Sequence, residues 1–255
     1  MFPDAKKASA LFPPDGTACD FTGKRQENFH RRFCPSKRTC RKNFSAVFPL
    51  EGCFAVFQGV CLFGTMDKSS CRRYYSAIRS QLGSGLRRIY DRRIRDFIRE
   101  LPEFSAVPGV AAFVPLKGEA DLLELSAGKP LFLPRFDAAD GGYGMVEVRD
   151  LSADLVPGRY NIPEPRPELP PATPDVCKNL LYLIPAVACD RRGTRLGRGG
   201  GWYDRILAGV SYRAAVIYSC QLAETPLPVE PHDVPMWRIV TENGVITPES
   251  IYNAV

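Results

Sequence analysis

The sequence has little histidine and tryptophan, two of each in 255 residues, and its nine cysteines include no C-x-x-C pair. An odd number of unpaired cysteines argues against a disulfide framework and favours reduced thiols in the cytoplasm, with a mitochondrial location left open. No apolar run is long enough to span a bilayer, so a membrane partner is not expected. The chain also lacks the G-K-[ST] of a P-loop and the G-x-S-x-G of a hydrolase elbow.

Positive charge is concentrated at one end of the chain. Residues 1–65 hold ten Lys and Arg against five Asp and Glu, whereas the other 190 residues hold 24 against 23. A nucleic-acid-binding surface needs a basic face on the folded part, so no nucleic-acid partner is expected.

The first 65 residues differ from the rest in pattern as well as in charge. They contain ten of the fifteen phenylalanines and show no sustained helical or strand period. His30, Cys34 and Cys40 match no common zinc spacing, so unpaired thiols are the simpler interpretation. We therefore expect 1–65 to be a disordered or non-native extension, with Met66 as the functional start. A native peptide spanning Thr65 and Met66 would contradict that start.

Beyond Met66, short apolar segments alternate with amphipathic ones. Apolar residues recurring at spacings of three and four predict helices in 66–82 and 86–101. Buried or half-buried strands are expected at 107–116, 130–134, 144–150, 179–188, 213–219 and 238–244. Short helices are expected at 120–128 and 202–210, with a proline-rich connector at 156–175. The alternation predicts a single three-layer α/β domain, with a mostly parallel sheet flanked by helices.

The stretch "RLGRGGGWYDR", residues 195–205, follows a predicted buried strand and precedes a helix. Ligands of α/β proteins bind at the carboxyl ends of strands, and glycines let the backbone approach an anion closely. Arginines on both sides could add charge and paired hydrogen bonds. The alternative is a glycine-rich turn whose arginines merely face solvent.

A longer stretch, "IPAVACDRRGTRLGRGGGWYDRIL", resembles the signature of the 5-formyltetrahydrofolate cyclo-ligase family. "VPLKGEAD" (114–121), "LFLPR" (131–135), "GRYNIPEP" (158–165) and the region 221–244 resemble further family segments in the same order. The resemblance covers about 66–244 and implies that residues 66–255 form a cyclo-ligase domain. Trp202 stands where many members have tyrosine, and "KSSCR" departs from the family's usual Lys-x-x-Leu-Arg.

The resemblance implies an activity and a set of site residues. The expected reaction is the ATP- and Mg²⁺-dependent conversion of 5-formyltetrahydrofolate to 5,10-methenyltetrahydrofolate, by phosphorylation of the formyl oxygen and attack by N10, in a monomer. Catalytic roles are implied for Arg198, Tyr203 and Glu119. ATP-binding roles are implied for Lys68, Arg72, Arg195, Leu196, Gly197, Arg198, Gly199, Gly200, Gly201, Trp202 and Tyr203. Substrate-binding roles are implied for Val114, Glu119, Arg198, Gly199, Gly200, Gly201 and Trp202. Magnesium ligands are implied at Asp204 and Asp233.

Each of these residues also has a plain structural interpretation. Lys68 and Arg72 would then belong to an exposed basic helix face, Asp204 to the first turn of a helix, and Glu119 to a helix start. For the whole chain, the alternatives are a non-catalytic folate- or nucleotide-binding relative and an interaction protein that uses its basic tail.

Overall fold

The computed structural model describes residues 45–47, 56–58, 67–139, 141–207 and 209–248. The chain divides into two compact units, Met1–Cys61 and Leu62–Val255. In the first unit, β1 (Ser45–Val47) pairs antiparallel with β2 (Val56–Gln58). The expected extension over 1–65 otherwise lies outside the described residues.

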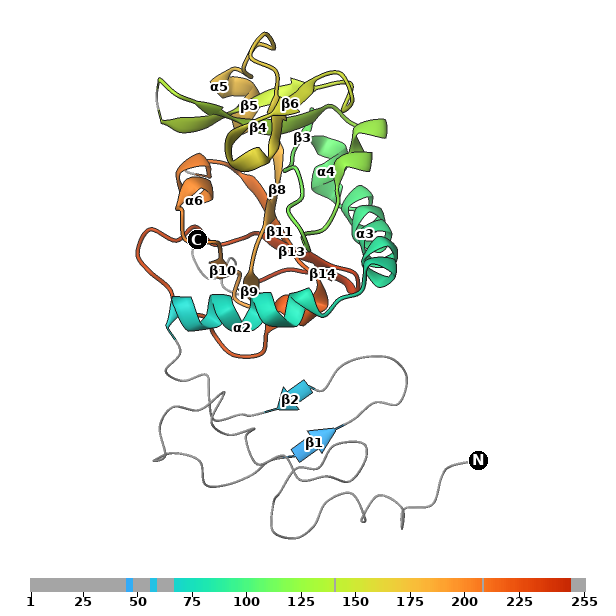
Figure 1. The fold of residues 1–255 in the computed structure, drawn as a ribbon, viewed down its shortest axis with the longest axis vertical. Coiled ribbons are helices and arrows are strands. Elements are labelled where there is room, and N and C mark those ends of the chain that lie inside the picture. Colours follow the sequence, from blue (N-terminus) through green and yellow to red (C-terminus); the bar gives the residue numbers. More distant parts are fainter. Residues whose placement is uncertain (1–44, 48–55, 59–66, 140, 208, 249–255) are drawn as a thin grey trace. The chain divides into compact units, whose positions relative to one another are not determined.

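The second unit is built around a seven-stranded sheet (Figure 1). Its strands are, in spatial order, β14 (Gly244–Ile246), β13 (Arg238–Thr241), β11 (Tyr212–Val216), β8 (Leu181–Pro185), β3 (Val110–Ala111), β4 (Leu131–Asp137) and β5 (Gly142–Val148). The five inner strands are parallel, and β14 and β5 pair antiparallel at the two edges. The expected mostly parallel sheet is confirmed.

Helices lie on both sides of this sheet, with α3 and α4 on one side of β8 and α6 on the other (Figure 1). The helices are α2 (Lys68–Ser80), α3 (Ser84–Arg99), α4 (Pro102–Ala106), α5 (Pro174–Lys178) and α6 (Trp202–Ile206). Short 3-10 turns are η3 (Leu123–Ala127), η4 (Arg159–Asn161) and η5 (Ser219–Gln221). Two small sheets complete the unit: β10 (Arg195–Leu196), β9 (Ala188–Asp190) and β12 (Leu222–Ala223), and β6 (Leu155–Pro157) with β7 (Pro163–Pro165).

Helix α2 begins where its sequence supplies a cap. The Asp67 carboxylate accepts a hydrogen bond from the Ser70 amide at 2.7 Å, which satisfies one of the free N–H groups of the first turn. Cys71, Tyr75 and Arg79 follow at intervals of four and are buried, so the helix packs on this stripe. Arginine is rarely buried unless it is paired, so Arg79 indicates that this face of α2 does more than pack against apolar side chains.

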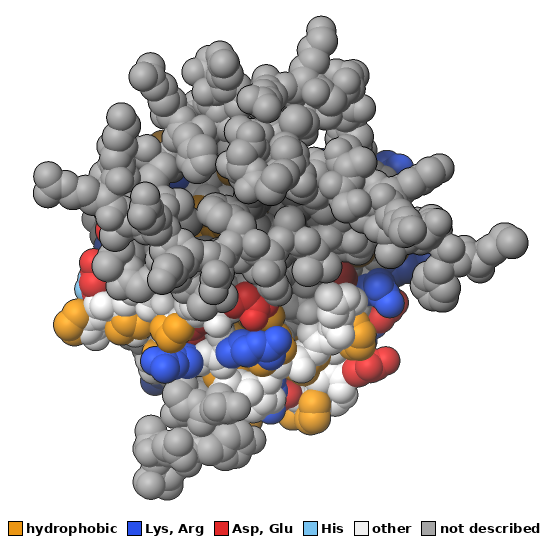
Figure 2. Space-filling model, turned by 90° about the horizontal axis from the view of Figure 1, so that it is seen from below, with side chains coloured by type: hydrophobic (Ala, Val, Ile, Leu, Met, Phe, Trp, Pro, Cys, Tyr) orange, Lys and Arg blue, Asp and Glu red, His pale blue; other side chains and the backbone are white. Residues whose placement is uncertain are grey.

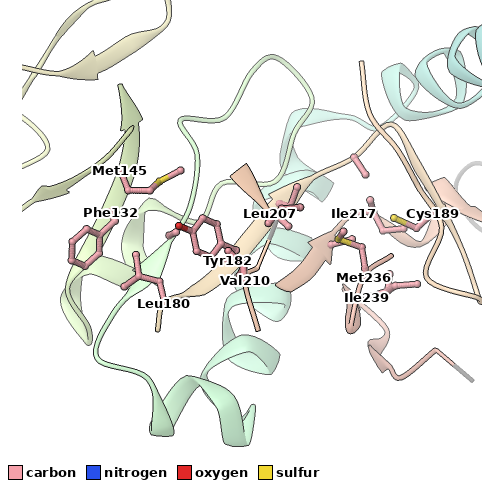
Figure 3. Packing of buried hydrophobic residues seen from close by; sticks show 14 residues of the cluster. Phe132, Met145, Leu180, Tyr182, Cys189, Leu207, Val210, Ile217, Met236 and Ile239 are labelled. Atoms are coloured by element: carbon pink, nitrogen blue, oxygen red, sulfur yellow. The ribbon is translucent and has the colours of Figure 1, made fainter. Parts of the chain in front are cut away.

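The main hydrophobic core lies against β8 and its neighbours (Figure 3). Leu180, Tyr182 and Ile184 alternate along the chain at β8 and belong to one cluster with Ile217 and Ile239. Such alternation places every second side chain on the same face of a strand. Packing in the core thus fixes the register of β8. The segment that follows β8, which leads to the glycine loop, therefore begins at a well-packed position.

Several expected elements differ in detail. The expected strand 107–116 contains only Val110–Ala111, because Pro108 precedes it and the chain then leaves the sheet towards a turn at Gly118. The expected helix 120–128 is the 3-10 turn η3, whose first amide, that of Leu123, bonds to the Asp121 carboxylate at 3.0 Å. The sequence pattern also did not indicate the small sheet of β9, β10 and β12.

The described surface mixes side chains of different kinds. On the face in Figure 2, basic, acidic and hydrophobic side chains of the described residues lie next to one another, without a continuous basic patch among them. Among the described residues, no helix is both long and apolar enough to cross a membrane.

Candidate active site

The order of the parallel strands locates a binding site. Along the chain, the parallel strands follow one another as β3, β4, β8, β11 and β13. Across the sheet, they lie in the order β4, β3, β8, β11 and β13. The connections therefore change direction between β3 and β8, and in such sheets ligands bind outside the carboxyl ends of the strands at this point. The chain after β3 leads to Glu119, and the chain after β8 leads to the glycine loop at 197–201.

The glycine loop is anchored at both ends. It follows the hairpin of β9 and β10, in which Arg195 pairs with Cys189, and it ends at α6. Gly199 has a φ of +100°, and a Cβ there would lie 3.4 Å from the Arg72 guanidinium carbon. A Cβ at Gly200 would lie 2.7 Å from the Trp202 ring. At these positions the backbone needs glycine because of its conformation and because side chains of the site approach it.

The glycine loop and Glu119 meet through an ion pair. Arg198 donates to one Glu119 oxygen, Oε1, from Nη2 at 3.0 Å and from Nε at 3.2 Å. The other oxygen, Oε2, accepts the Leu116 amide at 3.0 Å. Residues 79 positions apart in sequence are thus brought together at the switch point, and both carry predicted site roles.

Helix α2 contributes two predicted side chains to this end of the unit. Arg72 donates from Nε to the Gly197 carbonyl at 2.8 Å, so it fixes the start of the loop. Lys68, one turn earlier, lies 2.7 and 2.9 Å from the two Asp233 oxygens. Arg72 thus contacts the glycine loop and Lys68 contacts Asp233, so the two side chains do not simply form an exposed basic face.

Arg195 and Asp204 form a second ion pair at the loop. Arg195 Nη2 lies 3.0 Å from Asp204 Oδ1, and the Arg195 side chain is buried. The Arg195 guanidinium also lies 5.5 Å from the centre of the Tyr203 ring. Burial raises the pKa of the Tyr203 phenol, and the Glu119 carboxylate raises it further, so the hydroxyl keeps its proton at neutral pH. It can then act as a hydrogen-bond donor.

The two predicted magnesium ligands take part in different ion pairs. Asp233 lies in a group with Glu230 and His232 whose potential ligand atoms are all within 4.8 Å of one another, and this group does not include Asp204. The Lys68 ammonium lies within 2.9 Å of both the Asp233 and Glu230 carboxylates, so a cation already fits among these oxygens. Carboxylates suit Mg²⁺, so the donor set fits this ion.

Burial alone would raise the pKa of Asp233, but hydrogen bonds from Lys68 and the Glu230 amide lower it overall. Sequence reasoning missed Glu230 and His232. Their signal was the segment "EPHD", which places three potential ligands within four residues.

The remaining predicted residues lie at the borders of the site. Trp202 packs edge-to-face on Tyr143, with ring centres 5.1 Å apart, and the Arg205 guanidinium lies over the Trp202 ring, 4.3 Å from its centre. Val114 is half-buried against the core cluster that contains Leu131. Leu196, in β10, is also buried in a core cluster, so for it and Val114 the structure shows packing contacts.

Sequence reasoning also assigned no role to two groups that the structure places beside the site. Tyr143 lies on β5, in a half-exposed strand whose pattern gave no sign of a ligand site. Arg79 matched the spacing of the basic residues in the family's first helix but was given no role, yet it is buried and its Nη1 lies 3.9 Å from Glu119 Oε1. Only the fold brings either residue next to the glycine loop.

The fold and the paired loops define a doubly wound α/β protein with an arginine-bearing glycine loop at its switch point. The family model for 5-formyltetrahydrofolate cyclo-ligases matches residues 65–242. The chain therefore belongs to the 5-formyltetrahydrofolate cyclo-ligase family.

Individual relatives agree with this membership. A 5-formyltetrahydrofolate cyclo-ligase of Mycolicibacterium smegmatis is 35% identical over 148 residues, which are 54% of this chain and 75% of the relative. A mitochondrial one of Arabidopsis thaliana is 30% identical over 191 residues, 63% of this chain and 69% of the relative. The solved 5,10-methenyltetrahydrofolate synthetase of Aquifex aeolicus has a TM-score of 0.63 at 32% identity, covering 72% of this chain and 94% of that one.

Proposed function

We propose that this chain converts 5-formyltetrahydrofolate to 5,10-methenyltetrahydrofolate in a reaction driven by ATP. Family membership supports the reaction, and the contact between Arg198 and Glu119 at 3.0 Å is the observation that carries the site. This contact joins the loop predicted to bind ATP to the residue predicted to bind the folate. Two substrates that must react with each other are thereby assigned to one place.

The proposed chemistry has two steps. The formyl oxygen attacks the γ-phosphorus of ATP, and ADP leaves. N10 then attacks the activated formyl carbon and loses its proton, and the carbon–oxygen bond breaks to release phosphate. The protein has to stabilise the charge of the transferring phosphoryl group and to hold N10 close to the carbon.

The residues of the glycine loop suit the first of these tasks. Arg195 and Arg198 supply guanidinium groups that can hold phosphate oxygens in pairs, and Lys68 and Arg72 supply charge from α2. The protonated Tyr203 hydroxyl can donate to a phosphate or to the formyl oxygen. Glu119 would orient the pterin by accepting its N–H groups, while Trp202 would provide an aromatic surface beside it.

Magnesium would be held by Asp233, with Glu230 and His232 beside it, and by Asp204 as the family resemblance implies. When bound, the ion would neutralise charge on the phosphates of ATP. For Asp233 to take a metal, Lys68 must leave it, and the phosphates of ATP offer Lys68 a new partner. A magnesium titration of Asp233→Asn and Asp204→Asn would separate their contributions: each should weaken magnesium affinity if both are ligands.

The reaction is tested with the purified full chain. 5-Formyltetrahydrofolate, ATP and Mg²⁺ are mixed with the protein, and the absorbance of 5,10-methenyltetrahydrofolate is followed. Product should form only when all three are present, with one ADP released per product. A folded protein that binds ATP without forming product would favour a non-catalytic relative instead.

The organisation of the chain is a separate proposal. Residues 66–255 would suffice for the reaction as a cytoplasmic monomer, without membrane or nucleic-acid partners, and residues 1–65 would be dispensable. The start of the family match at residue 65 supports this division. Equal kcat/KM for residues 66–255 and the full chain would be expected, and sedimentation at one protomer mass. Activity restored only by residues 1–65 would contradict it.

A further inference from the structure

Arg79 is a buried cation that the proposed chemistry does not use. It comes from the packed face of α2, its side chain is 8% exposed, and its Nη1 has no hydrogen-bond partner among the residues that the structure describes. Burial lowers the pKa of the Arg79 guanidinium, Glu119 opposes this change, and Arg198 adds to it. Placing a charged group here is costly, so its position next to Glu119 calls for an explanation.

Glu119 has two arginines that differ in freedom. Arg198 makes the closer contact, at 3.0 Å, but its side chain is 54% exposed. It also stands between Gly197 and Gly199, and glycines restrict the backbone less than other residues do. Arg79 lies farther away, at 3.9 Å, but is held by the packing of α2. Glu119 itself is 7% exposed, so its carboxylate would be a buried, unpaired charge if neither arginine stood beside it.

We propose that Arg79 is a positioning residue: it remains as the fixed partner of Glu119 when Arg198 leaves to bind an anionic group of a substrate. The ligand-free contact between Arg198 and Glu119 is then a resting state. Arg79 makes the release of Arg198 feasible, because Glu119 keeps one cation beside Oε1 and the Leu116 amide on Oε2. This role rests on the proposed function, in which Arg198 binds substrate.

The surroundings of Glu119 also favour a fixed turn and a mobile Arg198. Gly118 has a φ of +86°, and a Cβ there would lie 3.5 Å from Arg79 Nε, so Arg79 packs directly on this turn. On the other side, the buried Tyr218 hydroxyl donates to Asp91 at 2.7 Å and lies 3.5 Å from the Glu119 carbonyl oxygen. The turn is thus contacted by Arg79 of α2 and by Tyr218, which is itself bonded to Asp91 of α3, whereas Arg198 reaches Glu119 from a loop.

The first test needs no ligand. Exchange of the Leu116 amide, which Glu119 accepts, is measured by NMR in the full chain carrying Arg198→Gln, with and without Arg79→Gln. Arg198→Gln alone should stay within about twofold of wild type, and the double variant should exchange at least about tenfold faster. Arg95→Gln combined with Arg198→Gln is the matched control, because Arg95 is a buried arginine on α3 that pairs with Glu124. It should behave like Arg198→Gln alone.

Two results would overturn the proposal. One is loss of Leu116 protection in Arg198→Gln alone, and the other is full protection in the double variant. If the double variant does not fold, Arg79→Lys with Arg198→Gln replaces it. The lysine keeps a cation beside Glu119, so exchange should stay within about threefold of Arg198→Gln, and faster exchange would count against the proposal.

The second test separates this role from the proposed function. Without ATP, Arg79→Gln should bind 5-formyltetrahydrofolate about tenfold more weakly than wild type, since Arg198 must then leave Glu119 without either of the two arginines that pair with it, and Arg79→Lys should restore most of the affinity. Arg95→Gln should stay within about twofold. Affinity unchanged in Arg79→Gln would overturn the proposal. A wild-type chain that does not bind this folate would instead contradict the proposed function, while the exchange test still decides the role of Arg79.

Discussion

The core on β8 and the rim at its carboxyl end come from one continuous segment, yet they are built differently. Along β8, Leu183 and Ile184 are fully buried among other apolar side chains. About ten residues later, Arg195 in β10 and Arg198 in the glycine loop are each paired with a carboxylate. In the core, stability depends on filling space. At the rim, each arginine is paired with a carboxylate, and a charged group of a ligand can replace that carboxylate as its partner.

The largest effect is expected from a substitution in the core, which should change stability and leave activity nearly unchanged. Ile184→Ala removes a fully buried side chain and should lower the free energy of unfolding by about 3 kcal/mol. Because Ile184 lies in the core cluster and has no predicted role in the site, kcat/KM of the folded protein should change less than about threefold. Urea unfolding and the absorbance assay measure the two quantities. A loss of stability below about 1 kcal/mol would show that the core tolerates the cavity.

The next largest effect is expected from a substitution at the rim, which should change activity and leave stability nearly unchanged. Arg198→Gln should lower kcat/KM by about 100-fold, the loss typical of one donor to transition-state charge. Its exposed side chain should cost less than about 1 kcal/mol of stability. Arg205→Gln is the control, since Arg205 stacks on Trp202 in the neighbouring helix and should matter less than about threefold. Equal activity losses in the two variants would contradict a specific role for Arg198.

Two glycine substitutions separate the effect of backbone strain on stability from the effect of the glycine loop on activity. Gly199→Ala and Gly141→Ala both place a side chain at positive φ, +100° and +62°, and each should cost about 1–2 kcal/mol of stability. Only Gly199 has a site residue, Arg72, against the added carbon. We expect about a tenfold loss of kcat/KM for Gly199→Ala, as the loop shifts, and none for Gly141→Ala. Similar activity in both would mean that the loop does not need this glycine.

The smallest effect concerns the pH dependence of one rim pair. The folded-state pKa of Asp233 is lowered, since its hydrogen bonds outweigh burial, so its stabilising contribution is present above the unfolded pKa of 3.8. It is lost as the pH falls through the lower folded value. Asp233→Asn and Lys68→Met should each remove about 1 kcal/mol or less above about pH 5, and the difference from wild type should vanish in acid. Urea titrations across this range measure it. A difference that grows towards low pH would contradict the sign.

The sequence predicted the core better than the rim because periodicity records burial. The apolar run around Leu183 and the helical stripe of Tyr75 could be recognised without a structure. The glycine loop was recognisable because its composition is rare. The contact of Arg198 with Glu119 was not, since the two residues lie 79 positions apart in the sequence and only the strand order brings them together. Arg79 was noticed only for its family-like spacing, and its place beside Glu119 was missed for the same reason, because burial within α2 depends on what packs against it.

Glu119→Gln gives the most direct test of the account. This substitution keeps the size of the side chain but removes the charge that both Arg198 and Arg79 face at the switch point. ATP-dependent formation of 5,10-methenyltetrahydrofolate is measured for the full-length wild type and this variant side by side. We predict product from the wild type and a kcat/KM at least about 100-fold lower in the variant, with both proteins folded. No product from the wild type, or equal rates in both proteins, would contradict the proposed site.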